Sequence, residues 1–401
     1  MPGNLLVGQS GGCTAVMNAS LAGVLDQAGQ QNQVGRVYGM RHGIAGLLDD
    51  DVVALDPADS DLRRRLSRMP AAALGSVRHR LTDDEIEQAL TSIRRLDVRY
   101  LHYIGGNDSA HTSLDLARAA AHAGHELFVV GIPKTVDNDL PAIDHSPGFA
   151  SAARFLAMAV IDAGHDTRAM QRTDPVKVIE VGGRNAGWLA AAASLGRRDE
   201  SDAPHLVYLP EQPLDPDGVV RDVERVLRRH GWAIVVVSEG VRTSGGALLE
   251  ASYDGVYTDR FGHPQLGGAG RTIAGLIARH CNVRAKYDRP GSLQRLLRAY
   301  RAPVDVREAR RAGRAAVRFA VAGHTGVIAG LQAERSPRYR SWFTPVPLIE
   351  IANSEQRLPD AFQMAPDAYP GPALRAYAEP LVGALDHDDA KLLAERTMSL
   401  I

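Results

Sequence analysis

Two short polar runs carry the residue types that phosphate chemistry requires. The first is Gly105-Gly106-Asn107-Asp108-Ser109, and the second is Pro133-Lys134-Thr135-Val136-Asp137-Asn138-Asp139. The first run is rich in backbone N–H groups that little side-chain bulk shields, as a phosphate cradle needs. The second run presents two carboxylates and a lysine, which suit acid–base catalysis and the neutralisation of a metal–phosphate group. A capped helix start and a polar turn are the purely structural alternatives.

Each run follows a short apolar stretch, which predicts that both lie at the carboxyl ends of buried parallel strands. The stretches cover residues 100–104 and 127–132, and apolar runs bounded by Gly and Pro are typical of such strands. Open α/β sheets bind ligands at this edge. The turn Ser10-Gly11-Gly12 has the same setting, between a strand predicted at Asn4–Gln9 and a helix predicted at Met17–Ala28. We therefore expect it to contribute to the same phosphate site.

Charged residues after later predicted strands are candidates for binding a second anionic group. Arg184, in a glycine-rich run, offers the planar fork that binds phosphate. Glu239 ends an apolar strand, where a carboxylate can accept hydrogen bonds from sugar hydroxyls. Lys286, Gln294 and Arg295 flank a loop that can hold another phosphate. Each of these residues can also be read alone as a solvated surface group, so their weight comes from their occurrence together.

The composition is that of an ordinary globular protein. The 401 residues are 45% hydrophobic and 23% charged, and the formal net charge of -1 gives no argument for a nucleic-acid or membrane partner. The two cysteines, Cys13 and Cys281, are too few for a disulfide framework, so we expect a cytoplasmic location. No segment approaches the ~20 apolar residues of a membrane helix, and the histidines show no metal-ligand spacing.

Strand and helix patterns alternate along the chain, which predicts an α/β fold with mainly parallel sheets. Two lobes are favoured over one, with a division near Pro147-Gly148. Thr82 is the expected N-cap of a helix, with Glu85 as its capping-box partner. The last ~60 residues contain many prolines and are expected to be irregular. The remaining predicted strands are 175–181, 205–209, 233–238 and 326–331, and the helices are 85–96, 112–123, 149–164, 188–195, 218–230 and 302–322.

Taken together, these motifs resemble the phosphofructokinase family. The motifs occur in the family's order from about Asn4 to Pro359: Ser10–Gly12, Leu74–Arg78, Gly105–Ser109, Pro133–Asp139, Glu180–Gly187, Pro210-Glu211, Ser238-Glu239 and Pro290–Arg295. The resemblance implies two doubly wound lobes with the active site in the cleft between them. It assigns residues 1–148 and about 294–340 to a phosphoryl-donor lobe, and residues 149–293 and about 341–395 to a sugar-phosphate lobe.

The resemblance also implies an activity, the transfer of a phosphoryl group to the 1-hydroxyl of fructose 6-phosphate. Asp137 matches the catalytic base, with Thr135 and Arg184 as further catalytic residues, and Asp108 and Asp139 match positions near Mg²⁺. The matching donor-binding positions are Gly11, Gly12, Arg78, Gly106, Asn107, Asp108 and Lys134. The matching sugar-phosphate positions are Thr135, Asp137, Gly182, Gly183, Arg184, Glu239, Lys286 and Arg295.

Asp108 and Lys134 indicate which donor the resemblance implies. ATP-using members have Gly in place of Asp108 and usually Gly in place of Lys134. A carboxylate at Asp108 fills space and repels a third phosphate, by several kcal/mol at contact distance for an effective dielectric of about 20. The pair therefore resembles the diphosphate-dependent branch. Exchange of a diphosphate bond for a sugar phosphate ester lies near equilibrium, so we expect a reversible reaction in glycolysis or gluconeogenesis.

Several departures from the family pattern keep alternatives open. Asn107 replaces an Asp that often binds Mg²⁺. The others cluster at the sugar positions (Pro175, Gly182, Lys286 and Ser292), so a longer substrate such as sedoheptulose 7-phosphate stays open. An ATP-dependent 6-phosphofructokinase is the nearest rival, and a non-catalytic subunit or a lipid or NAD kinase are more distant ones.

Regulation and assembly are also predicted from the resemblance. Ala22 and Asp26 stand where nucleotide-regulated members carry two effector-binding Arg, which predicts a non-allosteric enzyme. The expected partners are small-molecule substrates, without nucleic acid or membrane. A homodimer is expected, with a homotetramer as the alternative.

Overall fold

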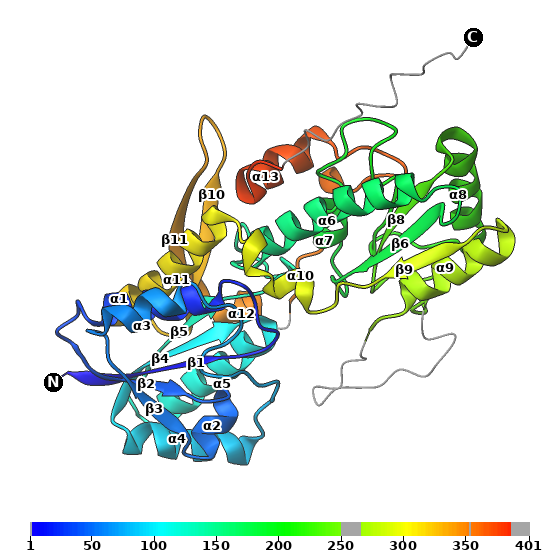
Figure 1. Cartoon of the computed structure of the whole chain (residues 1–401). Coiled ribbons are helices and arrows are strands. Elements are labelled where there is room, and N and C mark those ends of the chain that lie inside the picture. Colours follow the sequence, from blue (N-terminus) through cyan, green and yellow to red (C-terminus); the bar gives the residue numbers. More distant parts are fainter. Residues whose placement is uncertain (1, 250–265, 353, 386–401) are drawn as a thin grey trace, which may run out of the picture.

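A computed structural model of the chain describes residues 2–249, 266–352 and 354–385. Two sheets organise these residues, in the orders β11-β10-β5-β4-β1-β2-β3 and β7-β8-β6-β9, and each forms the centre of one lobe (Figure 1). The first sheet contains β1 (Gly3–Gln9), β2 (Val34–Met40), β3 (Val52–Leu55), β4 (Val98–Gly105), β5 (Phe128–Pro133), β10 (Val327–Glu334) and β11 (Arg340–Pro347). The second contains β6 (Val176–Val181), β7 (Leu206–Tyr208), β8 (Ala233–Ser238) and β9 (Ala285–Asp288).

The central strands of the larger sheet are parallel, and its two edge strands, β3 and β11, are antiparallel to their neighbours. Ile104 of β4 pairs with Gln9 of β1 and with Ile132 of β5. The carboxyl ends of these three strands therefore lie side by side. This register brings together the three polar turns that the sequence analysis placed after strands.

The smaller sheet is wholly parallel and aligns two further polar turns. Val181 at the end of β6 pairs with Ser238 at the end of β8. Glu239 therefore lies beside the start of the Gly182-Gly183-Arg184 turn, and the Glu239 N–H donates to the Val181 carbonyl (2.9 Å).

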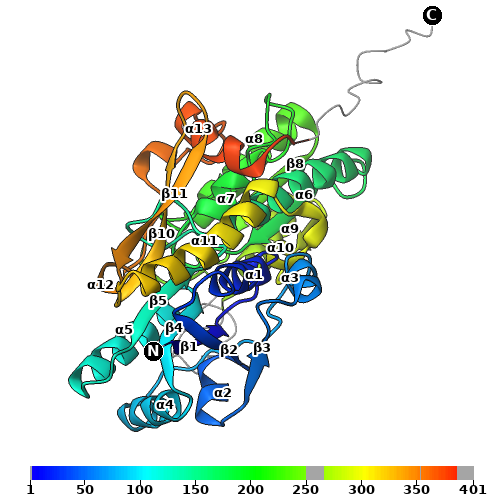
Figure 2. The ribbon, with the colours of Figure 1, turned by 90° about the vertical axis from the view of Figure 1, so that its left-hand side faces the viewer.

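Helices cover both faces of each sheet. On the larger sheet, α1 (Met17–Ala28) and α11 (Pro303–Val321) pack against each other on one face (Figure 2). The other face carries α2 (Ile44–Leu48), α4 (Asp83–Arg95) and α5 (Asn107–His122), while α3 (Ser60–Leu66) packs beside α1. On the smaller sheet, α8 (Pro216–His230) and α9 (Ala269–His280) share one core.

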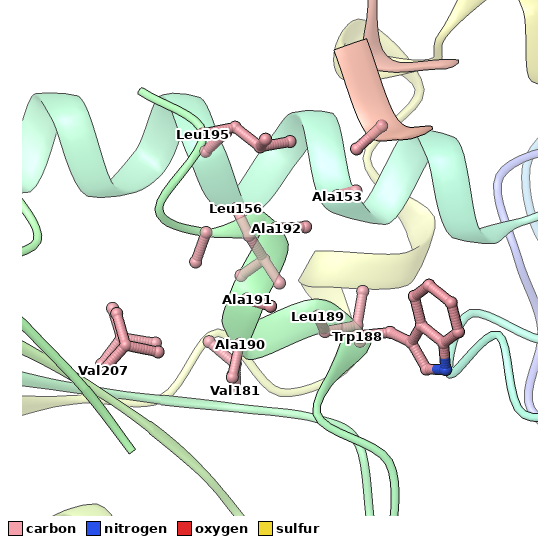
Figure 3. Packing of buried hydrophobic residues seen from close by; sticks show 14 of the residues in the cluster. Ala153, Leu156, Val181, Trp188, Leu189, Ala190, Ala191, Ala192, Leu195 and Val207 are labelled. Carbon is pink, nitrogen blue, oxygen red and sulfur yellow. The ribbon is translucent and has the colours of Figure 1, made fainter. Parts of the chain in front are cut away.

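The opposite core of the smaller sheet is built from α6 (Phe149–Ala169), α7 (Trp188–Ala192) and the C-terminal α13 (Pro372–Val382). Figure 3 shows α7 next to α6, with Trp188 at its first turn. Trp188 also packs against Tyr377 of α13, with ring centroids 5.1 Å apart. The remaining short elements are α10 (Leu293–Leu296), η1 (Arg298–Tyr300), α12 (Leu348–Ile351) and η2 (Asp360–Phe362).

The α/β class with mainly parallel sheets is confirmed. The Thr82–Glu85 capping box is present, because each residue's side chain bonds the other's backbone N–H. The start of α5 was predicted wrongly at Thr112, since the helix begins at Asn107 with Gly106 as its N-cap. Asp108 and Ser109 thus lie in the first turn rather than capping it.

The C-terminal part is more regular than predicted. It forms β11, α12 and α13, and β11 pairs with β10. Residues 341–347 therefore belong to the larger sheet, whereas the prediction placed them with the other lobe. The rest of the predicted division into a donor lobe and a sugar-phosphate lobe stays a prediction. In the described part of the chain, no helix is both long and apolar enough to cross a membrane.

Candidate active site

Two adjoining cavities lie where the strand ends of the two lobes face each other. One has a volume of about 520 Å³ and the other about 830 Å³. Both are lined by side chains or backbone from both lobes. The residues that line both cavities include Arg78, Lys134, Thr135, Asp137 and Arg184. These five residues therefore form the border between two neighbouring binding spaces.

The larger cavity collects every predicted donor-binding residue. Its lining contains Gly11, Gly12, Arg78, Gly106, Asn107, Asp108 and Lys134, and also Asp139. Gly11 has φ +75°, and an added Cβ would lie 3.1 Å from the Lys134 ammonium nitrogen. A Cβ on Gly12 would lie 2.8 Å from an Arg295 guanidinium nitrogen. Because Gly11 and Gly12 have no side chains, the basic side chains of Arg78, Lys134 and Arg295 can lie close to the backbone of this turn.

Lys134 is held inside the protein by backbone groups. Its ammonium donates to the Gly12 carbonyl (2.9 Å), and its own N–H donates to the Gly105 carbonyl (3.0 Å). The residue is only 4% exposed. Burial lowers the pKa of Lys134 to about 8, opposed in part by the neighbouring Cys13 and Asp137. An anion in this cavity would restore the full charge of the lysine, because an opposite charge favours the protonated form.

The two carboxylates of the second polar run are deeply buried. Burial, followed by the charge of Glu239, raises the pKa of Asp137. Burial, followed by the charge of Asp137, raises the pKa of Asp139. A carboxylate with a raised pKa is a stronger base, which suits proton removal from a hydroxyl group. The Asp137 N–H donates to the Thr135 hydroxyl (3.1 Å), which fixes the loop between them.

Asn107 supplies a buried oxygen without a hydrogen-bond partner among the described residues. It lines the larger cavity together with Asp108 and Asp139. Carboxylate and amide oxygens are the ligands that Mg²⁺ prefers, usually one or two from the protein with the rest from phosphate and water. The described residues contain no group of three or more His, Cys, Asp or Glu that would cage an ion alone. This donor set therefore fits a metal bound jointly with phosphate.

The smaller cavity collects the predicted sugar-phosphate residues of the second lobe. Gly182, Arg184 and Glu239 line it together with Arg295, which donates to the Cys13 carbonyl (3.0 Å). Gly183 does not line either cavity, but its φ of +108° forms the turn that presents Arg184.

Lys286 is the predicted residue that the structure places elsewhere. It lies on β9, outside the linings of both cavities, and its ammonium pairs with the Asp174 carboxylate at 2.7 Å. Its predicted contact with the sugar phosphate has no support within this single chain.

An ion-pair bridge that the sequence analysis missed holds Glu239. Arg289 contacts the carboxylates of both Glu180 (3.1 Å) and Glu239 (3.3 Å). Glu180 is buried and accepts hydrogen bonds from the N–H groups of Gly268 and Gly270, and from the Tyr287 hydroxyl. Burial raises the pKa of Glu239, and Arg289 opposes that rise. Arg289 also lines the smaller cavity, so it adds a cation to this space.

Gln294, named in the sequence analysis only as a possible phosphate-binding residue, also fixes the turn before Arg184. Its side-chain oxygen accepts the Gly182 N–H at 3.0 Å. In the sequence, these contacts of Gln294 and Arg289 are indicated only by the position of the two residues in or next to the Pro290–Arg295 motif. Gln294 and its partner Gly182, like Arg289 and its partner Glu180, are more than a hundred residues apart in the chain. Spacing alone therefore does not reveal these contacts.

Comparison with known proteins agrees with this geometry. The family model described as Phosphofructokinase matches residues 4–320. The chain is 37% identical over 366 residues to the pyrophosphate--fructose 6-phosphate 1-phosphotransferase of Xanthomonas campestris, which covers 90% of this chain and 87% of the relative. An ATP-dependent 6-phosphofructokinase of Amycolatopsis methanolica is 31% identical over 67% of this chain and 58% of its own length.

A solved structure gives the same result for the fold. The pyrophosphate-dependent phosphofructokinase of Nitrosospira multiformis superposes with a TM-score of 0.86 at 32% identity, covering 97% of this chain and 94% of that one. The match extends over both lobes. The resemblance predicted from the motifs is thus confirmed, and the chain belongs to the phosphofructokinase family.

Proposed function

We propose that the chain catalyses the reversible transfer of a phosphoryl group from diphosphate to the 1-hydroxyl of fructose 6-phosphate, yielding fructose 1,6-bisphosphate and phosphate. The observation that carries the proposal is the border shared by the two cavities, where Lys134, Asp137 and Arg184 lie. A donor in the larger cavity and a sugar phosphate in the smaller one would meet at these side chains.

The residues at the border supply what phosphoryl transfer needs, which is positioning and charge neutralisation. Asp137 accepts the proton of the attacking hydroxyl, helped by the raised pKa of its buried carboxylate. Lys134 and Arg184 neutralise the phosphoryl oxygens from opposite lobes. Mg²⁺ bound near Asn107, Asp108 and Asp139 would neutralise donor charge as a Lewis acid.

The donor preference rests on Asp108 and Lys134. Asp108 is exposed in the first turn of α5 and lines the larger cavity, where its charge would oppose a third phosphate group. Lys134 provides a buried cation for a compact anion without a nucleoside. The diphosphate-dependent relative matches more of the chain, at higher identity, than the ATP-dependent one, which supports the same preference.

A side-by-side assay tests the donor. Purified protein with fructose 6-phosphate and Mg²⁺ should form fructose 1,6-bisphosphate with diphosphate and not with ATP, and should run backwards with phosphate. Activity with ATP alone would overturn the donor assignment. Inactivity with both donors would favour a non-catalytic subunit that retains the fold.

The width of the sugar site is a second question for the same assay. The smaller cavity has a volume of about 520 Å³, and sedoheptulose 7-phosphate is kept as an alternative acceptor. Equal kcat/KM for the two sugar phosphates would establish the broader specificity.

A homodimer, or a homotetramer, is proposed as the active assembly. Lys286 lies half-exposed outside the cavities of the single chain. Both cysteines are free thiols, which suits the reducing cytoplasm proposed for the enzyme. Light scattering of the purified protein tests the assembly.

A further inference from the structure

Asn138, between the two buried carboxylates, has an unusual backbone conformation. Its φ is +55°, in the left-handed region that side-chain-bearing residues rarely adopt. The residue is 2% exposed, and it separates Asp137 from Asp139 in the loop that lines both cavities. Because the chain turns at Asn138, this residue sets the directions in which its two neighbours point. Something must hold Asn138 in this conformation.

The Asn138 side chain is held at both ends. Its amide nitrogen donates to the Tyr377 hydroxyl (2.8 Å), and its amide oxygen accepts the Ser146 N–H (2.9 Å). The Ser146 hydroxyl in turn accepts the Thr135 N–H (2.9 Å). Tyr377 is therefore connected, through two side chains, to a residue that lines both cavities.

Tyr377 is itself fixed on every side. Its hydroxyl donates to the Asp144 carbonyl (2.8 Å) while accepting from Asn138. The Arg335 guanidinium lies 4.2 Å from the centre of the tyrosine ring and binds the Asp144 carboxylate through two bonds of 2.7 Å. Trp188 packs against the ring from the second lobe. The hydroxyl thus has both its partners in the loop that follows β5, although the ring belongs to α13.

We propose that Tyr377 is a positioning residue for the phosphoryl-transfer reaction, because its hydroxyl holds Asn138 in the conformation that aims Asp137. Tyr377 lines neither cavity, and its effect passes through Asn138. Removal of the hydroxyl leaves the Asn138 amide and the Asp144 carbonyl without this partner inside the protein, where an unmade hydrogen bond is costly. The loop can then relax, and a displacement of about 1 Å at a catalytic group lowers the rate roughly 10²-fold.

The inference rests on the proposed function, and its test uses a matched pair of tyrosines. Tyr377→Phe removes the hydroxyl that binds Asn138. Tyr339→Phe removes the hydroxyl of a half-buried tyrosine, which donates to Glu308 (2.5 Å) in the neighbouring network. We expect Tyr377→Phe to lower kcat about 10- to 100-fold with KM for both substrates within about threefold. Tyr339→Phe should keep kcat within about twofold at a comparable loss of thermal stability.

A double variant tests the route through Asn138. Asn138→Gly removes the side chain while tolerating the positive φ. If Tyr377 acts through Asn138, adding Tyr377→Phe to Asn138→Gly should lower kcat by less than about twofold further, because the two residues share one interaction. Independent, multiplicative losses would overturn the proposal. Asn138→Gly alone also carries the test if Tyr377→Phe does not fold, and an unchanged kcat in that variant would contradict it.

Hydrogen-exchange mass spectrometry gives a readout that needs no activity. The Ser146 N–H, bonded to Asn138, should exchange at least tenfold faster in Tyr377→Phe than in the wild type, and at the wild-type rate in Tyr339→Phe. Inactivity of the wild type with diphosphate, with this exchange pattern intact, would refute the proposed function and leave the positioning role standing. Identical exchange and identical kcat in the two variants would refute the positioning role.

Discussion

The two halves of the cleft are built by different means. In the larger cavity the backbone holds the polar groups: Gly11 donates to the Val77 carbonyl, and Lys134 bonds the carbonyls of Gly12 and Gly105. In the smaller cavity side chains hold the polar groups: Arg289 bridges the carboxylates of Glu180 and Glu239, and the Gln294 side chain accepts the Gly182 N–H. We infer that the larger, backbone-built cavity accepts one compact ligand. In the smaller, side-chain-built cavity, single substitutions can change which ligand binds.

The largest expected effect comes from Asp137, one of the residues that line both cavities. Asp137→Ala should lower kcat by about 10³-fold, because it removes the proposed base for the hydroxyl proton. Binding of diphosphate, measured by calorimetry, should change little. Asp222→Ala, a change on α8 away from both cavities, is the control. An unchanged kcat in Asp137→Ala would remove this residue from the role of base.

The next effect separates the backbone-built half from the other. Lys134→Met deletes the buried cation at nearly constant volume, and KM for diphosphate should rise about 10- to 100-fold, as expected for the loss of a charge-assisted hydrogen bond. KM for fructose 6-phosphate should change much less. The matched control is Lys286→Met, which lies outside both cavities and should leave KM for diphosphate unchanged.

The control also sharpens the comparison. A rise in KM for fructose 6-phosphate in Lys286→Met would show that the predicted sugar-phosphate contact is made in the assembled enzyme. Equal effects of Lys134→Met on both substrates would break the division of the cleft into two halves.

A smaller effect should be confined to the side-chain-built half. Arg289→Leu removes the bridge between Glu180 and Glu239, so KM for fructose 6-phosphate should rise about tenfold through the loss of one charged hydrogen bond. Arg289→Lys keeps the charge but not the fork, and should recover only part of the loss. A larger change in KM for diphosphate than for the sugar phosphate would contradict this assignment.

The smallest expected effect concerns stability rather than binding. Burial alone would lower the pKa of His145, but its bonds to Asp144 (2.7 Å) and Glu308 (2.9 Å) raise that pKa to about 9. Burial alone would raise the pKa of Asp144, but Arg335 and His145 lower it to about 2. The raised pKa of His145 contributes roughly 3 kcal/mol to the free energy of unfolding. This contribution is fully present below the unfolded pKa of about 6.5 and is lost as the pH rises through 9.

Thermal unfolding between pH 6 and 9.5 measures this loss. The melting temperature of the wild type should fall over that range by several degrees more than that of His145→Gln, which has no proton to lose there. Parallel curves for the two proteins would show that His145 stays neutral when buried.

The backbone-built half of the cleft was more predictable from the sequence than the side-chain-built half. Turns built by the backbone leave local signals, such as Gly11-Gly12 after β1 and the polar run after β5. The Arg289 bridge joins residues of three strand ends, and no local pattern encodes their contact. Lys286 was assigned to the site from its charge beside a loop and from the resemblance, and within the single chain β9 places it against Asp174.

The fold shows the same contrast. The capping box at Thr82 is a local signal and was predicted correctly. The helix α13 was missed because Pro372 and Pro380 were read as breakers, although Pro372 lies in the first turn, where its missing N–H costs nothing. Similarly, β11 contains Pro345 and Pro347, which an edge strand tolerates.

The bond between Asn138 and Tyr377 spans 239 residues of chain, and this has a consequence during synthesis. At a translation rate of 5–20 residues per second, roughly 10 to 50 s separate the emergence of the two residues from the ribosome. Throughout that interval the nascent chain can form the larger sheet up to β5, yet it lacks the tyrosine that holds Asn138. We expect chains that stop before α13 to bind phosphate but to catalyse phosphoryl transfer much more slowly than the full chain.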